Sequence, residues 1–262
     1  MADARAGYEP ILNEALGLYP SLLNDPPPVR VGNQKVKHLA HGWYLRCHRS
    51  VEAILTLDRA GFAEEASPIR RSVIEHTVAL NWLAVEGDKI EDTVANGHAR
   101  HTETLSKAIS AAAWTSVDLA ELTEIIAEID PENRNQRNNH LLHWDKRLEG
   151  YGDEHTLPGY LAECAKTHPS YQSAISYIEI PDGAIEIPDG ALLWEPQDPL
   201  WQVPFCTTHL LMALVSVRQI FDPEPWEREL EDIGERYRVV TDAVRHQDGL
   251  APINWATGTL QS

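Results

Sequence analysis

Apolar positions recur at helical spacing along most of this chain, most clearly in its first half. Over 36–57, apolar or small residues return every three or four positions, which predicts a helix of about six turns. A second helix is predicted from Ser67, with Pro68 in its first turn, to near Gly87. A third is predicted over 89–113, with an inward stripe of Ile90, Val94, His98, His101, Leu105, Ala108 and Ala112. The short connections between these helices favour antiparallel packing.

The second half carries two more strong helical patterns. Residues 204–221 are apolar on nearly all sides, which predicts a central helix buried by its neighbours. Residues 226–247 are amphipathic and follow a pair of prolines, and weaker helical patterns lie at 9–23 and 158–177. The pattern as a whole predicts an all-α fold, an antiparallel helical bundle of about six to eight helices.

The helical pattern is interrupted near 177–194, where Glu-Ile-Pro-Asp-Gly-Ala occurs twice. Pro-Asp-Gly favours turns and the isoleucines alternate with polar residues, so we expect a small β-hairpin-like insertion. The proline run before Val29 is expected to separate an N-terminal arm, 1–30, from the bundle. The predicted domain organisation is therefore that arm, one bundle domain over 31–250 with its insertion at 177–200, and an irregular tail over 251–262.

Composition and charge narrow the class of protein. With 262 residues, 43% of them hydrophobic, the chain can form a sizeable core. A net charge of −18 repels phosphate backbones, so we expect no binding to duplex DNA. The chain shows neither a signal peptide nor an apolar run that would span a membrane. Three cysteines without zinc-site spacing are typical of reduced thiols, so we expect a cytoplasmic protein without a membrane partner.

Candidate chemistry lies in the second predicted helix, which carries Arg70, Arg71, Glu75 and His76 among apolar residues. Histidine titrates near neutral pH and arginine binds phosphate, and cleavage of RNA by its own 2′-OH needs both kinds of group. Five residues turn an ideal helix by about 140°, so Arg71 and His76 do not share one face. The alternative is a non-catalytic protein that binds a small ligand or a partner, with Arg71 paired to Glu75 and His76 in a buried polar network.

The Arg-x4-His spacing of Arg71 and His76 is similar to the motif of HEPN domains, helical modules of which many are metal-independent ribonucleases in toxin and phage-defence systems. The resemblance implies that His76 moves a proton and Arg71 holds the charged phosphorane, with Arg70 and Glu75 beside them. It also implies an RNA substrate, no cofactor, an antitoxin or other partner protein, and a homodimer, because the HEPN motif acts where two protomers meet.

A third interpretation is a metal-dependent bundle enzyme. His98 and His101 lie three residues apart on the third predicted helix, and His48 and Glu52 lie four apart on the first. His and carboxylate side chains on facing helices hold iron or manganese pairs in bundle proteins, so these four residues are candidate ligands for Fe or Mn. The repeated Glu-x-x-His motif of such enzymes is absent from the sequence.

Two segments resemble a bacterial helical family of unknown function. Residues 69–75, Ile-Arg-Arg-Ser-Val-Ile-Glu, are similar to its Leu-Arg-Ser-Leu-Leu-Glu helix. Tyr160 followed by 167–170, Thr-His-Pro-Ser, is similar to a later segment with Tyr and then Val-His-Pro-Ser. The resemblance implies a helical fold and a bacterial source, and it implies no activity.

Overall fold

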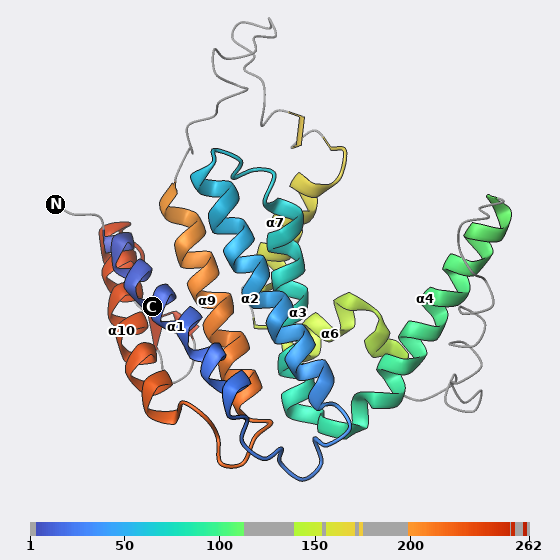
Figure 1. Cartoon of the computed structure of the whole chain (residues 1–262). Coiled ribbons are helices and arrows are strands. Elements are labelled where there is room, and N and C mark those ends of the chain that lie inside the picture. The colour runs from blue at the N-terminus through green and yellow to red at the C-terminus, as the bar shows by residue number, and fades with distance from the viewer. Residues whose placement is uncertain are drawn as a thin grey trace, which may run out of the picture.

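The computed structural model describes residues 4–112, 139–153, 156–170, 173–174, 199–251, 253–254 and 259–260. Helices dominate this part of the chain (Figure 1), so the prediction of an all-α fold is confirmed. The helical elements are η1 (Ala4–Gly7), α1 (Tyr8–Asn24), α2 (Lys37–Arg59), α3 (Ser67–Glu86), η2 (Gly87–Ile90), α4 (Glu91–Ala111), η4 (Asn139–Leu142), α6 (Trp144–Tyr151), α7 (Thr156–Thr167), α9 (Pro199–Arg218) and α10 (Glu227–Gln247).

The centre of the molecule is formed by α2, α3 and α9, which pack against one another (Figure 1). Helices α1 and α10 lie on one side of this trio, and α6 and α7 pack on α3 at the other. Helix α9 is buried as its apolar sequence predicts, since Leu210, Ala213 and Leu214 are fully enclosed. None of the described helices combines the length and hydropathy that crossing a lipid bilayer requires.

The segment before the proline run, predicted to be an N-terminal arm, packs on the core of the bundle. Helix α1 contributes Ile11, Leu12 and Tyr19 to the same core cluster as α2, α3 and α9. Tyr8 Oη also lies 2.8 Å from Thr241 Oγ1 of α10. The proline run is a connection within one core, because the apolar face of a short amphipathic helix is buried against its neighbours rather than left in water.

The C-terminal tail, 251–262, contains regular structure. Strands β1 (Ile253–Asn254) and β2 (Thr259–Leu260) pair antiparallel within the segment predicted to be irregular. The expected hairpin-like insertion at 177–194 lies outside the described residues.

Helix α4 differs from the predicted third bundle helix. It leads away from the central helices (Figure 1) and packs on η2 and η4. The predicted inward stripe is wrong, since His98, His101, Leu105 and Ala108 are exposed. The buried positions are instead Thr93, Asn96, Ala99, Thr102 and Ile109. Small and polar residues fill most of this helix, so no single apolar stripe determines which face is buried.

The C-terminus of α3 requires a glycine. Gly87 has φ +57°, and a Cβ there would lie 2.5 Å from both Asn33 Oδ1 and Gly32 O. We expect Gly87→Ala to lower the free energy of unfolding by about 1 to 3 kcal/mol, because the backbone conformation and the close contact both disfavour a side chain. Gly42→Ala is the control, since its Cβ meets nothing within 4 Å inside α2. Urea denaturation measures the free energy of unfolding of both variants. Equal stability of Gly87→Ala and wild type would contradict the expectation.

Candidate functional site

The four charged residues of α3 that suggested chemistry lie in different environments. Arg70 is 1% exposed, whereas Arg71, Glu75 and His76 are half-buried. The regular helix explains this division, because consecutive residues point about 100° apart around its axis. The sequence placed these groups on one element, and the fold separates them into a buried and an accessible set.

Arg70 belongs to the buried framework. Its Nε lies 2.9 Å from Glu163 Oε1 of α7, and both side chains are almost fully enclosed. Its Nη1 donates to Ala63 O at 2.7 Å and to Gln202 Oε1 of α9 at 3.2 Å. A buried guanidinium with these partners joins α3 to α7 and α9 and has no route to a substrate.

Arg71 connects the two segments that carry the family resemblance. Its Nε donates to Glu75 Oε1 at 3.1 Å, and its Nη1 donates to His168 Nε2 at 3.1 Å. The guanidinium also lies 5.2 Å from the ring centroid of Tyr160, within the range of a cation–π contact. Tyr160 lies on α7 and His168 directly after it, so the fold brings 69–75 and 160–170 together.

His76 is held in one orientation on the half-buried face of α3. Its Nδ1 donates to Ser72 O at 2.7 Å, one turn earlier, which leaves Nε2 as the acceptor nitrogen of the neutral ring. Burial lowers the pKa of His76 below the ordinary value of 6.5. The bond to Ser72 opposes this shift, the nearby Arg46 lowers the pKa further, Glu75 raises it and Arg147 lowers it. His76 is therefore neutral at physiological pH and able to accept a proton.

Two arginines from other helices, Arg46 and Arg147, are near enough to His76 for their charges to lower its pKa. Arg46 is exposed on α2, and Arg147 is half-buried on α6 with its guanidinium 5.8 Å from the ring centroid of Trp82. Burial lowers the pKa of Arg147 and the neighbouring Glu75 raises it, but an arginine keeps its charge in proteins. We call His76 with Arg46, Arg71, Glu75 and Arg147 the His76 site.

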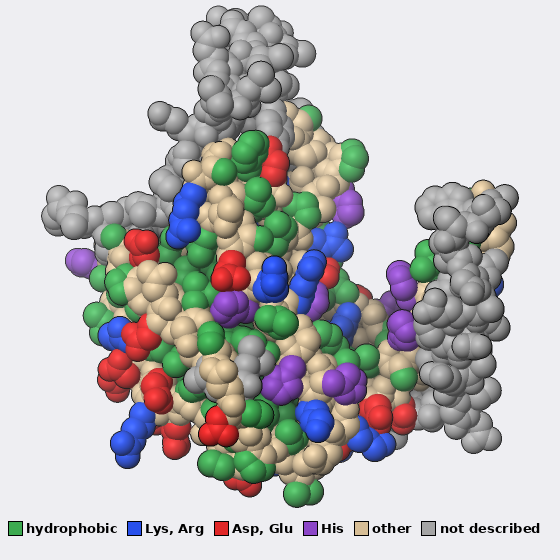
Figure 2. All heavy atoms as spheres, viewed as in Figure 1, with side chains coloured by type: hydrophobic (Ala, Val, Ile, Leu, Met, Phe, Trp, Pro, Cys, Tyr) green, Lys and Arg blue, Asp and Glu red, His purple; other side chains and the backbone are tan. Residues whose placement is uncertain are grey.

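The local charge of this face differs from that of the whole chain. Figure 2 shows basic and histidine side chains, with a few acidic ones among them, over the middle of the visible face, whereas acidic side chains are more frequent over α1 and α10. A net charge of −18 therefore does not prevent an anion from approaching the His76 site, because exposed charges more than about 10 Å away are screened at physiological salt.

Sequence reasoning found part of this arrangement. Arg71 pairs with Glu75, and the charge of Glu75 also acts on the pKa of His76, so Glu75 is the residue that relates the two others. His168 belongs to the segment that resembles the family, and no local pattern in the sequence places it against Arg71. Arg46 and Arg147 carry no local sequence signal, because only the packing of α2 and α6 beside α3 brings them to His76.

The residues of the metal interpretation lie on α2 and α4. His48 Nδ1 is 3.6 Å from Glu52 Oε2, and its Nε2 donates to Leu16 O at 3.1 Å. His98 and His101 are exposed on α4. Within the described ranges, no group of three or more His, Cys, Asp or Glu side chains is placed to hold a metal ion.

Fold and site together define an all-helical protein whose α2–α3–α6 face presents a neutral histidine among arginines. The chain belongs to a family of unknown function (DUF5677), whose profile matches residues 37–185 and so includes α2, α3 and both segments joined by Arg71. No curated protein and no solved structure matches the chain.

Proposed function

We propose that this protein is a metal-independent ribonuclease that cleaves single-stranded RNA, with His76 as the general base. One observation carries the proposal: His76 is anchored through Nδ1 to Ser72 O, and burial together with the charges of Arg46 and Arg147 from two other helices lowers its pKa. A positioned neutral imidazole accepts a proton, and arginines bear the charge of a phosphate group. A general base and phosphate-binding cations are what RNA transphosphorylation requires, so these residues support a mechanism that uses no metal ion.

The chemistry needs only groups of this site and the RNA itself. His76 Nε2 removes the proton of the 2′-OH, and the resulting oxygen attacks the adjacent phosphorus. The bond from phosphorus to the 5′-oxygen breaks, which gives a 2′,3′-cyclic phosphate on one fragment. The protonated His76 returns its proton to the departing 5′-oxygen. Arg46 and Arg147, with Arg71 beside Glu75, stabilise the extra negative charge on the phosphoryl oxygens in the transition state.

The resemblance to HEPN domains adds an assembly to the proposal. In that group the Arg-x4-His motif acts where two protomers meet, so we propose a homodimer in which two His76 sites adjoin. A cytoplasmic toxin or phage-defence effector restrained by a partner protein fits such an enzyme. Size-exclusion chromatography with light scattering tests the dimer, for which the expected mass is about twice that of the 29.4 kDa chain.

The activity is tested directly with purified protein, EDTA and a labelled single-stranded RNA. We expect cleavage of the RNA and none of the DNA of the same sequence, because DNA lacks the attacking 2′-OH. Cleavage of both, or of RNA only after a divalent metal is added, would contradict the proposal.

Removing a flanking cation is expected to weaken catalysis. Arg147→Gln should lower kcat/KM about 10- to 100-fold, because one charge-assisted contact to the phosphoryl oxygens is lost. The same change should raise the pKa of His76, so the acidic limb of the pH–rate profile moves to higher pH. Arg238→Gln is the matched control, an exposed arginine on α10. An unchanged rate and profile in Arg147→Gln would remove Arg147 from the site.

A further inference from the structure

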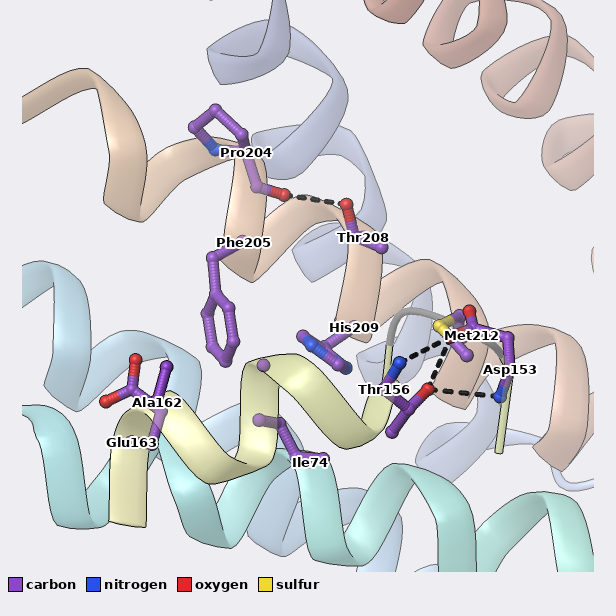
Figure 3. Close-up of a pocket in the computed structure, with 11 residues that line it drawn as sticks. Ile74, Asp153, Thr156, Ala162, Glu163, Pro204, Phe205, Thr208, His209 and Met212 are labelled. Carbon is purple, nitrogen blue, oxygen red and sulfur yellow. Dashed lines mark hydrogen bonds between the residues drawn. The ribbon is translucent and has the colours of Figure 1, made fainter. Parts of the chain in front are cut away.

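Cavities lie on two sides of α3. One, of about 280 Å³, lies between α3, α7 and α9 (Figure 3), and its α3 residue Ile74 is about 200° around the helix from His76. Another, of about 470 Å³, lies between the C-terminal part of α3 and α6, and its lining includes Trp82, Glu86 and Tyr151. We call this second cavity the α3–α6 pocket. Its volume falls within the range of small-molecule pockets, about 300 to 1,000 Å³.

The α3–α6 pocket continues from the His76 site along one face of α3. Glu75, Trp82 and Glu86 follow one another at steps of seven and four residues, so they lie within about 40° of one another around the helix. Arg147 joins the two places, because its guanidinium lies 5.8 Å from the ring centroid of Trp82 and its charge acts on His76. His76 and Trp82 are about 9 Å apart along the helix axis. A nucleotide whose phosphate lies at the His76 site can therefore reach the pocket with its base.

The charged side chains that line the pocket form pairs of opposite sign. Glu86 Oε2 lies 3.8 Å from Lys89 Nζ, and Glu149 Oε2 lies 2.8 Å from Lys146 Nζ. Glu86 is 31% exposed and the other three side chains more so, so all four can reach a ligand. An exposed ion pair contributes little to stability and can exchange its partner at small cost. Two charges of each sign favour a neutral polar group over a phosphate in this pocket.

Glu86 is the carboxylate of the pocket that a neighbouring side chain holds in place. Tyr151 Oη donates to Glu86 Oε1 at 3.0 Å. Burial, together with this bond, raises the pKa of Tyr151 to about 12, so the phenol remains a donor at neutral pH. A carboxylate has about four acceptor positions on its two oxygens. Glu86 can therefore accept two hydrogen bonds from a ligand in addition to the one from Tyr151.

We infer that the α3–α6 pocket binds a guanine base. The inference rests on the proposed ribonuclease function, in which this base belongs to the nucleotide whose 2′-OH attacks. Guanine carries its N1–H and N2–H donors side by side, with the O6 acceptor next to them, whereas adenine and cytosine offer one amino group beside a ring acceptor and uracil a single N–H. Glu86 accepts from both guanine donors, and Lys89 beside it donates to O6.

Calorimetry with guanosine 3′-monophosphate and inosine 3′-monophosphate tests the base contact on the full-length protein without any cleavage. The two nucleotides differ only in the N2 amino group, which inosine lacks. We expect the guanosine nucleotide to bind with a dissociation constant below about 1 mM, and the inosine nucleotide to bind at least about tenfold more weakly. Equal affinity for both, or no binding of the guanosine nucleotide, would overturn the inference.

Glu86→Gln gives the second measurement. Affinity for guanosine 3′-monophosphate should fall at least about tenfold, because the amide has one acceptor oxygen where the carboxylate has two. The amide oxygen can still accept from Tyr151, so the variant should fold. Glu103→Gln is the matched control, since Glu103 forms a partly exposed pair with Lys107 on α4, and it should bind like the wild type. Undiminished affinity in Glu86→Gln would overturn the inference.

Cleavage distinguishes a base within RNA from a free nucleotide. In a single-stranded RNA that contains all four bases, wild type should cut after guanosine at least about tenfold faster than after the other three. Equal cutting after all four bases would overturn the inference and leave the ribonuclease function standing. A protein that binds guanosine 3′-monophosphate with the expected selectivity but cuts no RNA would contradict the ribonuclease function, and would support a guanine pocket that serves a free nucleotide.

Discussion

RNA cleavage is expected to fall about 100- to 10,000-fold in His76→Ala, the range that a general base contributes. The variant lacks the imidazole Nε2 that accepts the 2′-OH proton, and an arginine cannot replace it because its pKa is too high. Single-turnover cleavage of a labelled RNA measures the loss. His98→Ala is the matched control, because His98 is exposed on α4. This variant should cleave RNA at the wild-type rate.

The pH dependence gives the same prediction an independent test. The base acts only when neutral, so activity is lost as pH falls through the pKa of His76. Burial and the flanking arginines lower that pKa, so the midpoint of the acidic limb should lie below pH 6.5. A midpoint above 6.5, or wild-type cleavage by His76→Ala, would contradict the role of His76. The second result would favour a protein that binds a ligand or partner without catalysis.

Arg70→Met is expected to lower the free energy of unfolding by about 3–5 kcal/mol. The substitution keeps an unbranched side chain but leaves the carboxylate of Glu163 buried without its cation. Arg71→Met is the matched control on the next position of α3. Its pair with Glu75 is partly exposed, so we expect a loss of less than about 1 kcal/mol. Urea denaturation compares the two variants with wild type.

The double variant Arg70→Met/Glu163→Leu separates loss of the ion pair from loss of shape. Removing both charges leaves no uncompensated group in the core, so stability should recover substantially relative to Arg70→Met alone. If the double variant is less stable than Arg70→Met, the loss of stability in Arg70→Met does not come from an unpaired Glu163 carboxylate.

The sequence predicted those parts of the fold that depend on local patterns. Helix α9 could be recognised because a run apolar on all sides can only be buried, and α3 because its serine and proline mark its start. The buried face of α4 could not be predicted, because its small and polar residues do not distinguish one face of the helix from another. A proline run signals a turn and says nothing about whether the helix before it packs on the core, so the packing of α1 does not follow from the sequence.

The candidate site was only partly predictable for a similar reason. Arg71 and Glu75 are four residues apart, so their pairing follows from helix geometry, and His76 is the residue next to Glu75. The burial of Arg70 depends on Glu163 and Gln202, which come from helices remote in sequence. Arg46 and Arg147 reach His76 only through tertiary packing, and no local pattern distinguishes them from surface arginines.

The most direct test uses a DNA strand that contains one ribonucleotide, incubated in EDTA with wild type and with His76→Ala. The proposed chemistry predicts that wild type cuts only at the bond after the ribonucleotide and leaves a 2′,3′-cyclic phosphate, detected by mass spectrometry, while His76→Ala leaves the strand intact. An uncut strand with wild type, or the same cut by both proteins, would contradict the assignment of His76 as the base.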